Sequence, residues 1–197
     1  MIPLDEAIWH QLSCHNITGR EFAKILKGYY AGTIPGRKAL QEDLLQCICG
    51  GNVYDSALAA APHLTHLASR CDPSSAAVML EFAAMAIAEA STGNGPRFDP
   101  RLTGPLREAA CAGVIETMRV LESPNLDTFT REEMEAALLA FSGDIEGYRN
   151  AIAEINAWWE GWSSSPQQVT EMPAPLPRNE VIWGDNSPSS QTSSGEE

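Results

Sequence analysis

Apolar residues recur every three or four positions through most of the first 162 residues, and glycine or proline interrupts the pattern at intervals of roughly twenty residues. No stretch between these interruptions alternates apolar and polar residues as a half-buried strand would. A spacing of three and four places the apolar side chains on one face of a helix. We therefore predict an all-α fold with one domain over residues 1–162.

The interruptions divide this domain into about eight helices. Two of them begin at capping-box motifs, in which a threonine precedes a glutamate by three residues: Thr18 with Glu21, and Thr130 with Glu133. The last helix has the longest apolar seam. The expected helices span residues 5–13, 18–32, 35–49, 54–69, 72–90, 103–122, 130–143 and 145–162.

Two residues inside these helices are unusual there. Pro62 lies within the fourth helix and lacks the backbone N–H that a helix interior needs, so we expect a kink or a break. Gly113 lies within the sixth helix, where its missing side chain would permit a neighbouring helix to pack closely.

The composition changes after Trp162. Residues 163–197 are rich in serine and proline, carry net negative charge and have few apolar side chains. Such a segment buries too little apolar surface to offset its chain entropy, so we expect a mostly disordered tail. One short stretch, Asn179–Trp183, is apolar enough to dock on the domain or on a partner, although a tryptophan in a polar tail is more often an ordinary residue without a docking role.

Residues 34–68 resemble bacterial HEAT-like repeat proteins of the kind found among toxin-immunity proteins. The resemblance rests on an Ile-Pro pair, a leucine-bearing helix, a short turn before a Val-Tyr pair, and small residues before an Ala-Pro step: Ile34-Pro35, Leu44, Leu45, Ile48, Cys49 to Asn52, Val53-Tyr54, Ala59 to Pro62, Leu64 and Leu67. The turn differs, because many relatives have a His-Gln-Gly run at Cys49-Gly50-Gly51. The resemblance implies a short α-solenoid, an architecture that offers an extended binding surface.

The charge balance bears on the choice of partner. The chain has 26 acidic and 13 basic residues and a net charge of -13. Nucleic acids and anionic lipids require positive charge on the protein, so neither is an expected partner. A basic protein is, because opposite charge speeds encounter and favours the complex.

The remaining composition predicts a cytoplasmic protein. No basic and apolar leader follows Met1, and the most apolar segment, Ala76–Ala90, is short and interrupted by Glu81 and Glu89. The five cysteines are odd in number and fit small buried apolar residues of a reducing compartment. They are Cys14, Cys47, Cys49, Cys71 and Cys111.

No residue pattern indicates catalysis, a metal or a cofactor. His63 and His66 have a spacing that can ligate a metal, but the same helix supplies no third ligand, and ordinary histidines are favoured. His10, Cys14 and His15 resemble no cysteine-hydrolase signature. The glycine-bearing loops lack the lysine and serine or threonine of a phosphate-binding loop.

Carboxylates on helix faces are therefore the candidate partner-binding residues, together with one tryptophan that would be a strong anchor if exposed beside them. The alternative is that they form solvated faces and stabilise helix dipoles. The candidates are Glu42, Asp43, Asp55, Glu132, Glu133, Glu135, Asp144, Glu146 and Trp158.

Small size, acidity, helical repeats and the lack of a catalytic pattern together favour one hypothesis. It is a cytoplasmic immunity protein of interbacterial competition, without enzymatic activity, that neutralises a basic toxin. A nuclease effector is the leading candidate, blocked at its active site or substrate groove. One alternative is a general HEAT-like interaction scaffold. Another is a helical-repeat DNA glycosylase, which the charge opposes. The oligomeric state stays open.

Overall fold

A computed structural model describes residues 1–32, 34–49, 52–92 and 99–162, without the side chains of 158–162. This part is mostly helical, as predicted. The predicted tail, including Asn179–Trp183, lies outside the described residues. The α-helices are α1 (Gly19–Tyr30), α2 (Arg37–Leu44), α3 (Asp55–Ala68), α4 (Pro73–Ala90), α5 (Thr103–Leu121), α6 (Thr128–Ser142) and α7 (Ile145–Trp162), with short 3-10 helices at Ala7–His10 and Pro100–Leu102.

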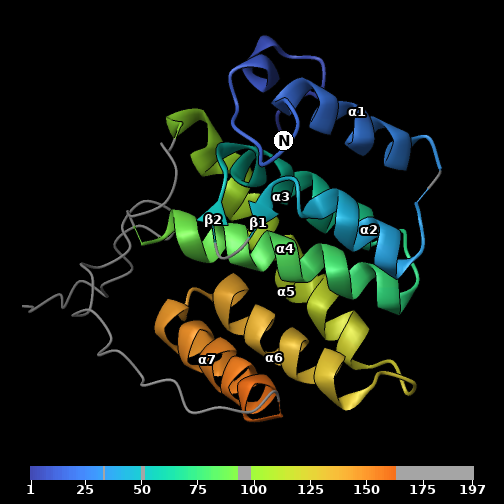
Figure 1. Cartoon of the computed structure of the whole chain (residues 1–197), viewed down its shortest axis with the longest axis vertical. Coiled ribbons are helices and arrows are strands. Elements are labelled where there is room, and N and C mark those ends of the chain that lie inside the picture. Colours follow the sequence, from blue (N-terminus) through green and yellow to red (C-terminus); the bar gives the residue numbers. More distant parts are fainter. Residues whose placement is uncertain (33, 50–51, 93–98, 163–197) are drawn as a thin grey trace, which may run out of the picture.

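The helices pack in two layers. α3 lies against α1 and α5, and α4 lies against α2 and α6, while α3 pairs with α4 and α5 with α6. α7 departs from this order, because it packs along α6 at the end of the molecule farthest from α1 (Figure 1). α4 is therefore central and has neighbours in both layers.

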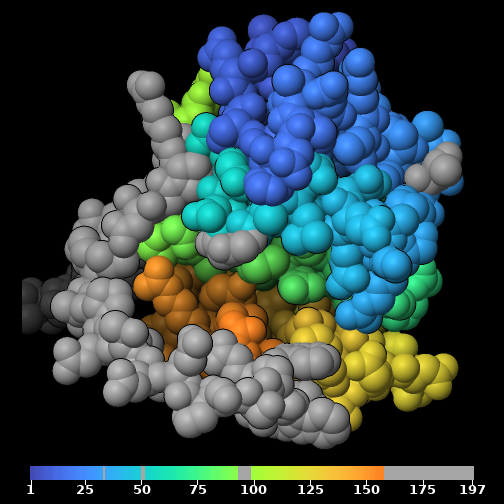
Figure 2. Space-filling view, viewed as in Figure 1, coloured from blue at the N-terminus to red at the C-terminus, as the bar shows by residue number. Residues whose placement is uncertain are grey.

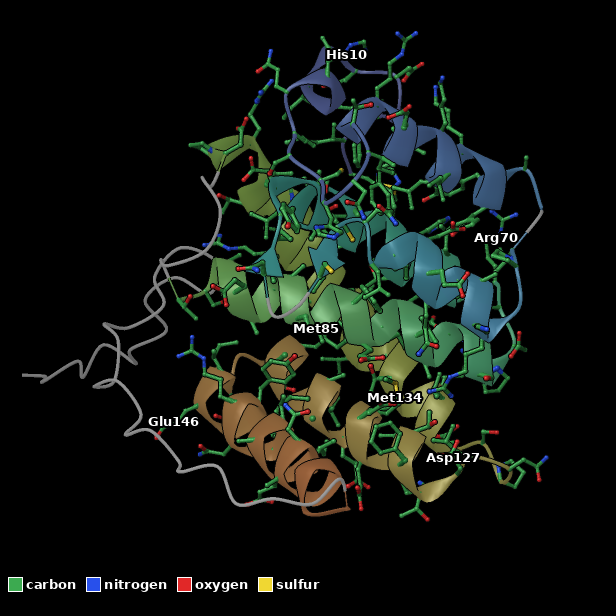
Figure 3. All side chains as sticks on the ribbon, in the orientation of Figure 1. His10, Arg70, Met85, Asp127, Met134 and Glu146 are labelled. Carbon is green, nitrogen blue, oxygen red and sulfur yellow. The ribbon has the colours of Figure 1, made fainter. Side chains whose placement is uncertain are left out.

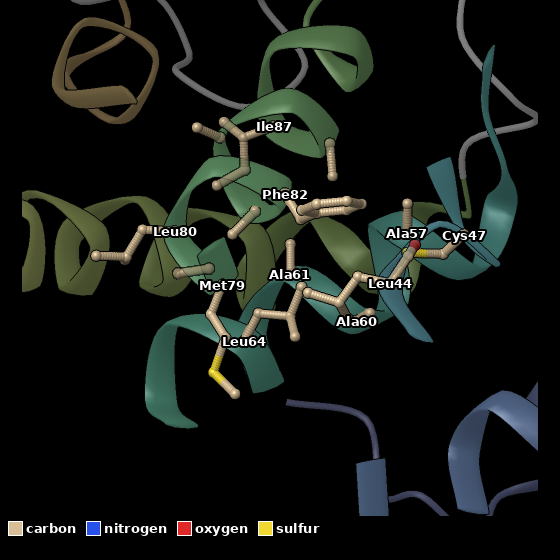
Figure 4. Packing of buried hydrophobic residues seen from close by; sticks show 14 of the residues in the cluster. Leu44, Cys47, Ala57, Ala60, Ala61, Leu64, Met79, Leu80, Phe82 and Ile87 are labelled. Carbon is tan, nitrogen blue, oxygen red and sulfur yellow. The ribbon is translucent and has the colours of Figure 1, made fainter. Parts of the chain in front are cut away.

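The core centres on the interface between α3 and α4, where small side chains let two helices approach closely (Figure 4). Ala57 to Ala61 of α3 are buried, and α4 contributes further buried alanines. Leu64 and Met79 are fully buried and belong to the same cluster. A helix that is apolar on nearly every side must be buried on nearly every side, which explains the central place of both.

The helix-start predictions have opposite outcomes. The capping box at Thr18 is confirmed: the Glu21 amide donates to Thr18 Oγ1 at 3.2 Å, and the Thr18 amide donates to Glu21 Oε2 at 2.8 Å. The box at Thr130 is wrong. Asp127 caps α6 instead, accepting from the Thr130 amide at 2.9 Å. A carboxylate is a strong N-cap, and this one starts the helix earlier than predicted.

Strands were not predicted, yet a small hairpin follows α2. Ile48–Cys49 (β1) pairs antiparallel with Asn52–Val53 (β2), with Ile48 opposite Val53. α2 ends at Leu44, short of the predicted residue 49. Two glycines between the strands favour a tight turn over continued helix, a signal that the helical spacing of the leucines obscured.

The remaining differences are small. α3 continues through Pro62, so no break occurs there. The first predicted helix, 5–13, is a single 3-10 turn, Ala7–His10. Gly113 permits close packing as predicted, because the ring of Phe141 occupies the place where a side chain would be.

The segment after the 3-10 turn closes the N-terminal end of α3. Ser13 Oγ accepts from the Asp55 amide at 3.2 Å, and the Ser13 carbonyl accepts from the Ser56 amide at 3.2 Å. The local N-cap, Tyr54, supplies no side-chain hydrogen bond. A residue 42 positions away therefore satisfies amides that a helix start leaves unpaired.

Candidate functional site: a carboxylate pocket between α4, α6 and α7

A pocket of about 180 Å³ lies where α4, α6 and α7 meet. The space-filling view shows a hollow between the green atoms of α4 and the orange atoms of α7 (Figure 2). The pocket is lined by Glu81, Ala84, Met85, Phe129, Glu133, Ala137, Tyr148, Ile152, Ile155 and Asn156.

Each helix contributes one face, which follows from the spacing of the lining residues. Residues four apart lie above one another on a helix. Glu81 and Met85 form such a pair on α4, and Tyr148 and Ile152 form one on α7. α6 contributes residues 129, 133 and 137 in the same way. The pocket thus has carboxylates from two helices and apolar side chains from all three.

Arg37 connects α2 to the α6 side of this pocket. Its Nη1 donates to Thr130 Oγ1 at 3.0 Å, and its Nη2 lies 3.6 Å from Glu133 Oε2. Thr130 in turn donates to Asp127 at 2.7 Å. The Glu133 side chain is only 12% exposed, and Arg37 is its one ionic partner in the part of the chain that the structure describes.

The pKa values of the Glu81 and Glu133 carboxyl groups are both raised, so each keeps its proton to a higher pH than an exposed glutamate does. Burial raises the pKa of Glu133 to about 8, and the nearby carboxylate of Glu81 adds to the rise while Arg37 opposes it. Burial likewise raises the pKa of Glu81, again opposed by Arg37. Water is largely excluded and two like charges are close, so both conditions disfavour the double anion.

Tyr148 also lines the pocket. The residue is 8% exposed, its hydroxyl still reaches solvent, and no hydrogen bond joins this hydroxyl to a residue that the structure describes. Burial, with Glu81 and Glu89 nearby, raises the pKa of its hydroxyl. A polar group that enters the pocket can therefore form a hydrogen bond with this hydroxyl.

The arrangement suits a small cation. Carboxylates in a site with little water attract a positive charge far more strongly than exposed ones do. A carboxyl group with a pKa near 8 can also give up a proton at neutral pH. Within the described ranges no three histidine, cysteine or acidic side chains are grouped to hold a metal ion. None of the described helices is long and apolar enough to cross a membrane.

The structure places the predicted acidic residues of α6 and the start of α7 at one end of the molecule. Glu132 and Glu135 are exposed on α6, while Glu133 points into the pocket. Asp144 caps α7 by accepting from the Gly147 amide at 2.9 Å. Glu146 is exposed and lies at the opposite end of this helix pair from Asp127 (Figure 3).

The other predicted residues lie apart from this end. Glu42 is exposed on α2, and Asp55 is half-buried in the first turn of α3. Asp43 accepts a 2.6 Å hydrogen bond from the hydroxyl of Tyr29, which gives it a structural role. Trp158 belongs to α7, but its side chain lies outside the described part.

Charge is distributed unevenly between the two ends. Residues 122–157 hold eight carboxylates and two arginines. One of the two, Arg131, donates to the Leu121 carbonyl at 3.1 Å. α1 has the opposite balance, with Arg20, Lys24 and Lys27 against one glutamate. The α6–α7 end is therefore the acidic end of the molecule.

His63 and Cys14, two of the histidine and cysteine candidates, take structural roles. His63 is buried, and its Nε2 donates to the Ile2 carbonyl at 2.8 Å while the Tyr30 hydroxyl donates to Nδ1 at 3.1 Å. Cys14 donates to Ser56 Oγ at 3.0 Å, and burial raises the pKa of its thiol, which disfavours the reactive thiolate.

Three residues of the pocket region escaped the prediction: Arg37, Glu81 and Tyr148. The signal for Glu81 is in the sequence, since a carboxylate flanked by apolar residues in a mostly apolar helix must lie half-buried or face a polar neighbour. Nothing in the sequence identifies that neighbour. Arg37 and Glu133 are 96 positions apart and meet only because α2 and α6 both pack on α4.

Comparison with known proteins finds no match: no family model, no curated protein and no solved structure is similar to this chain at a significant level.

Proposed function

We propose that this protein is an immunity protein without catalytic activity of its own, which binds a basic toxin and blocks its active site or substrate groove. The observation that carries the proposal is the acidic α6–α7 end with its desolvated carboxylate pocket. Of the two arginines in residues 122–157, Arg131 is half-buried and bonded to a backbone carbonyl. Most of that negative charge is therefore available to an external cation, and it complements the positive groove of a nuclease.

The helix arrangement supports a HEAT-like α-solenoid as the scaffold. Stacked helix pairs give two layers, and the contacts of α1, α3 and α5 on one side and of α2, α4 and α6 on the other follow that order. α7 then closes the last pair by packing on α6. In this proposal the repeat presents the acidic end rigidly, which lowers the entropy cost of binding.

A second candidate function, a general interaction scaffold, is favoured by one further observation. α5 exposes Ile115 and Met118, 68% and 52% accessible, beside the exposed Cys111. Residues spaced by three and four form one stripe on a helix. A scaffold would use this stripe in addition to the acidic end and would hold several partners with modest affinity.

The test is co-expression with a basic toxin domain encoded beside this gene. The proposal predicts survival of the toxin-producing cells and a complex whose affinity falls with salt. Reversing two exposed charges, Glu132→Lys with Glu135→Lys, should abolish protection. The matched control, Asp5→Lys with Glu6→Lys, reverses two exposed charges near the N-terminus, away from α6, and should protect as the wild type does.

Two results would contradict the proposal. One is a toxin that kills equally with and without this protein. The other is equal protection by both charge-reversed variants, since the acidic end would then be irrelevant. Several weak partners captured through the α5 stripe, with no effect on survival, would establish the scaffold function instead.

A further inference from the structure

We propose that the pocket between α4, α6 and α7 receives a single lysine side chain of the basic partner, with its ammonium group between Glu81, Glu133 and Tyr148. This inference rests on the proposed function for the identity of the partner, but the pocket's chemistry can be tested separately. In this inference one lysine of the partner anchors the complex at the acidic end, rather than attraction between the two charged surfaces alone.

Size argues for one side chain. Sites for cofactors and drug-sized ligands usually have volumes of about 300–1,000 Å³. This pocket has about 180 Å³ and opens to the surface between helices. It therefore admits a linear side chain more readily than a ring-bearing ligand.

The lining suits both parts of a lysine side chain, the apolar stem and the charged ammonium group. Met85, Ile152 and Ile155 offer apolar surface for the four methylene groups of the stem. Glu81 and Glu133 supply carboxylates from two different helices, and the Tyr148 hydroxyl supplies an acceptor from a third. An ammonium group has three N–H donors that diverge, so three acceptors from three helices suit it better than the planar fork of arginine.

Tyr148 is the observation that distinguishes a binding site from a solvated acidic cluster. The residue is 8% exposed in the pocket wall, and its hydroxyl has no hydrogen-bond partner among the described residues. Carboxylates that only form a solvated surface do not require a largely buried tyrosine with an unpaired hydroxyl beside them. The partner of this hydroxyl is therefore a ligand or water that enters the pocket.

Binding should release a proton. The groups facing Glu133 are Glu81 on α4, Arg37 on α2 and Asp127 before α6, with Tyr148 on α7 completing the wall. At neutral pH Glu133 is largely protonated, and an entering ammonium favours its ionised form. Affinity should therefore rise as pH is raised from about 6 to about 8.

The probe is n-butylammonium, the lysine side chain without its backbone, added to the full-length ¹⁵N-labelled protein and followed by NMR. We expect saturable shifts of the Glu81, Glu133 and Tyr148 amides with a dissociation constant on the order of millimolar. Neutral n-butanol, with the same stem, should not saturate these shifts. Equal shifts with butanol, or tighter binding of n-butylguanidinium, would overturn the assignment to lysine.

Two double variants distinguish binding in the pocket from general attraction to the acidic surface. Glu81→Gln with Glu133→Gln removes both pocket charges at nearly constant volume and should weaken butylammonium binding about tenfold or more. Asp5→Asn with Glu6→Gln removes two exposed charges near the N-terminus, away from the pocket, and should leave that binding unchanged. If both double variants bind the probe alike, the pocket is not the site.

The two proposals can fail independently. If the partner's affinity is unchanged by Glu81→Gln with Glu133→Gln but lost on charge reversal at Glu132 and Glu135, the inference fails and the proposed function stands. If butylammonium occupies the pocket but no basic toxin is neutralised, the inference stands and the proposed function fails.

Discussion

Arg37 reaches from the first turn of α2 to the pocket, and its Nη2 lies 3.6 Å from Glu133 Oε2. This partner does not offset the burial of the carboxylate, because the pKa of Glu133 is still raised to about 8. The ionised form of Glu133 therefore destabilises the fold.

The first prediction concerns Glu133→Gln and pH. The unfolded chain releases this proton near pH 4.5 and the folded chain near 8, so the folded state binds more protons in between. The free energy of unfolding of the wild type must then fall as pH rises through this window. Glutamine cannot ionise, so we expect the variant to become more stable than the wild type by about 1–3 kcal/mol at about pH 8.5.

Urea unfolding at about pH 5 and pH 8.5 measures this difference, and Glu132→Gln is the control because its side chain is exposed on the same helix. The control should track the wild type at both pH values. A Glu133→Gln variant whose stability difference from the wild type does not change with pH would show that this carboxyl group is ionised normally.

The second prediction concerns the contact between α5 and α6. The ring of Phe141 fills the space beside Gly113, so the methyl group of Gly113→Ala would overlap it. Overpacking of this kind costs about 1–3 kcal/mol. Gly28→Ala is the control, since nothing lies within 4 Å of the added carbon, and it should stabilise α1 by about 0.5–1 kcal/mol. Equal effects of the two substitutions in urea unfolding would contradict the packing argument.

Local sequence patterns predicted most of the fold, because each helix depends largely on residues that are close together in the sequence. The seam of α7 and the capping box at Thr18 lie within single elements, and the structure has both. The errors occurred where two local signals compete. Asp127 and Thr130 can each cap α6, and Asp127 does. The glycines at 50–51 competed with the helical spacing before them, and the chain forms a hairpin on either side.

The pocket could be predicted only in part. The acidic residues on the helix faces included Glu133, and Tyr148 lies in the apolar seam of the last predicted helix. Helix periodicity does not specify which helix faces contact one another. Glu81, Glu133 and Tyr148 come together through the packing of α6 and α7 on α4. Such contacts depend on crossing angles set by many side chains, so one sequence read alone does not specify them.

The third prediction concerns the titration of His63. Burial lowers its pKa to about 4, and the amino group of Met1 and the ring of His66 act in the same direction, while the hydrogen bond to the Ile2 carbonyl opposes them. The unfolded histidine takes up its proton near pH 6.5, so the unfolded state binds more protons between about pH 6.5 and 4. The free energy of unfolding should fall by about 1–3 kcal/mol across that window as pH is lowered.

NMR titration of the His63 ring checks this directly, with a midpoint expected at about 4 and the proton on Nε2 in the neutral form. The fold should be intact above the window, because the neutral ring bridges the Ile2 carbonyl and the Tyr30 hydroxyl. A midpoint at the value of a free histidine would mean that the N-terminal segment does not cover this ring in solution.

The fourth prediction concerns the cap that Ser13 provides for α3. Ser13→Ala removes the acceptor of the Asp55 amide, and loss of an N-cap hydroxyl usually costs about 0.5–2 kcal/mol. Ser74→Ala is a matched control, because its exposed hydroxyl caps no helix. Hydrogen exchange gives the local readout: the Asp55 amide should exchange faster in Ser13→Ala alone. Unchanged protection of that amide would show that the first turn of α3 holds without the N-terminal segment, and α3 would then be capped by its own residues.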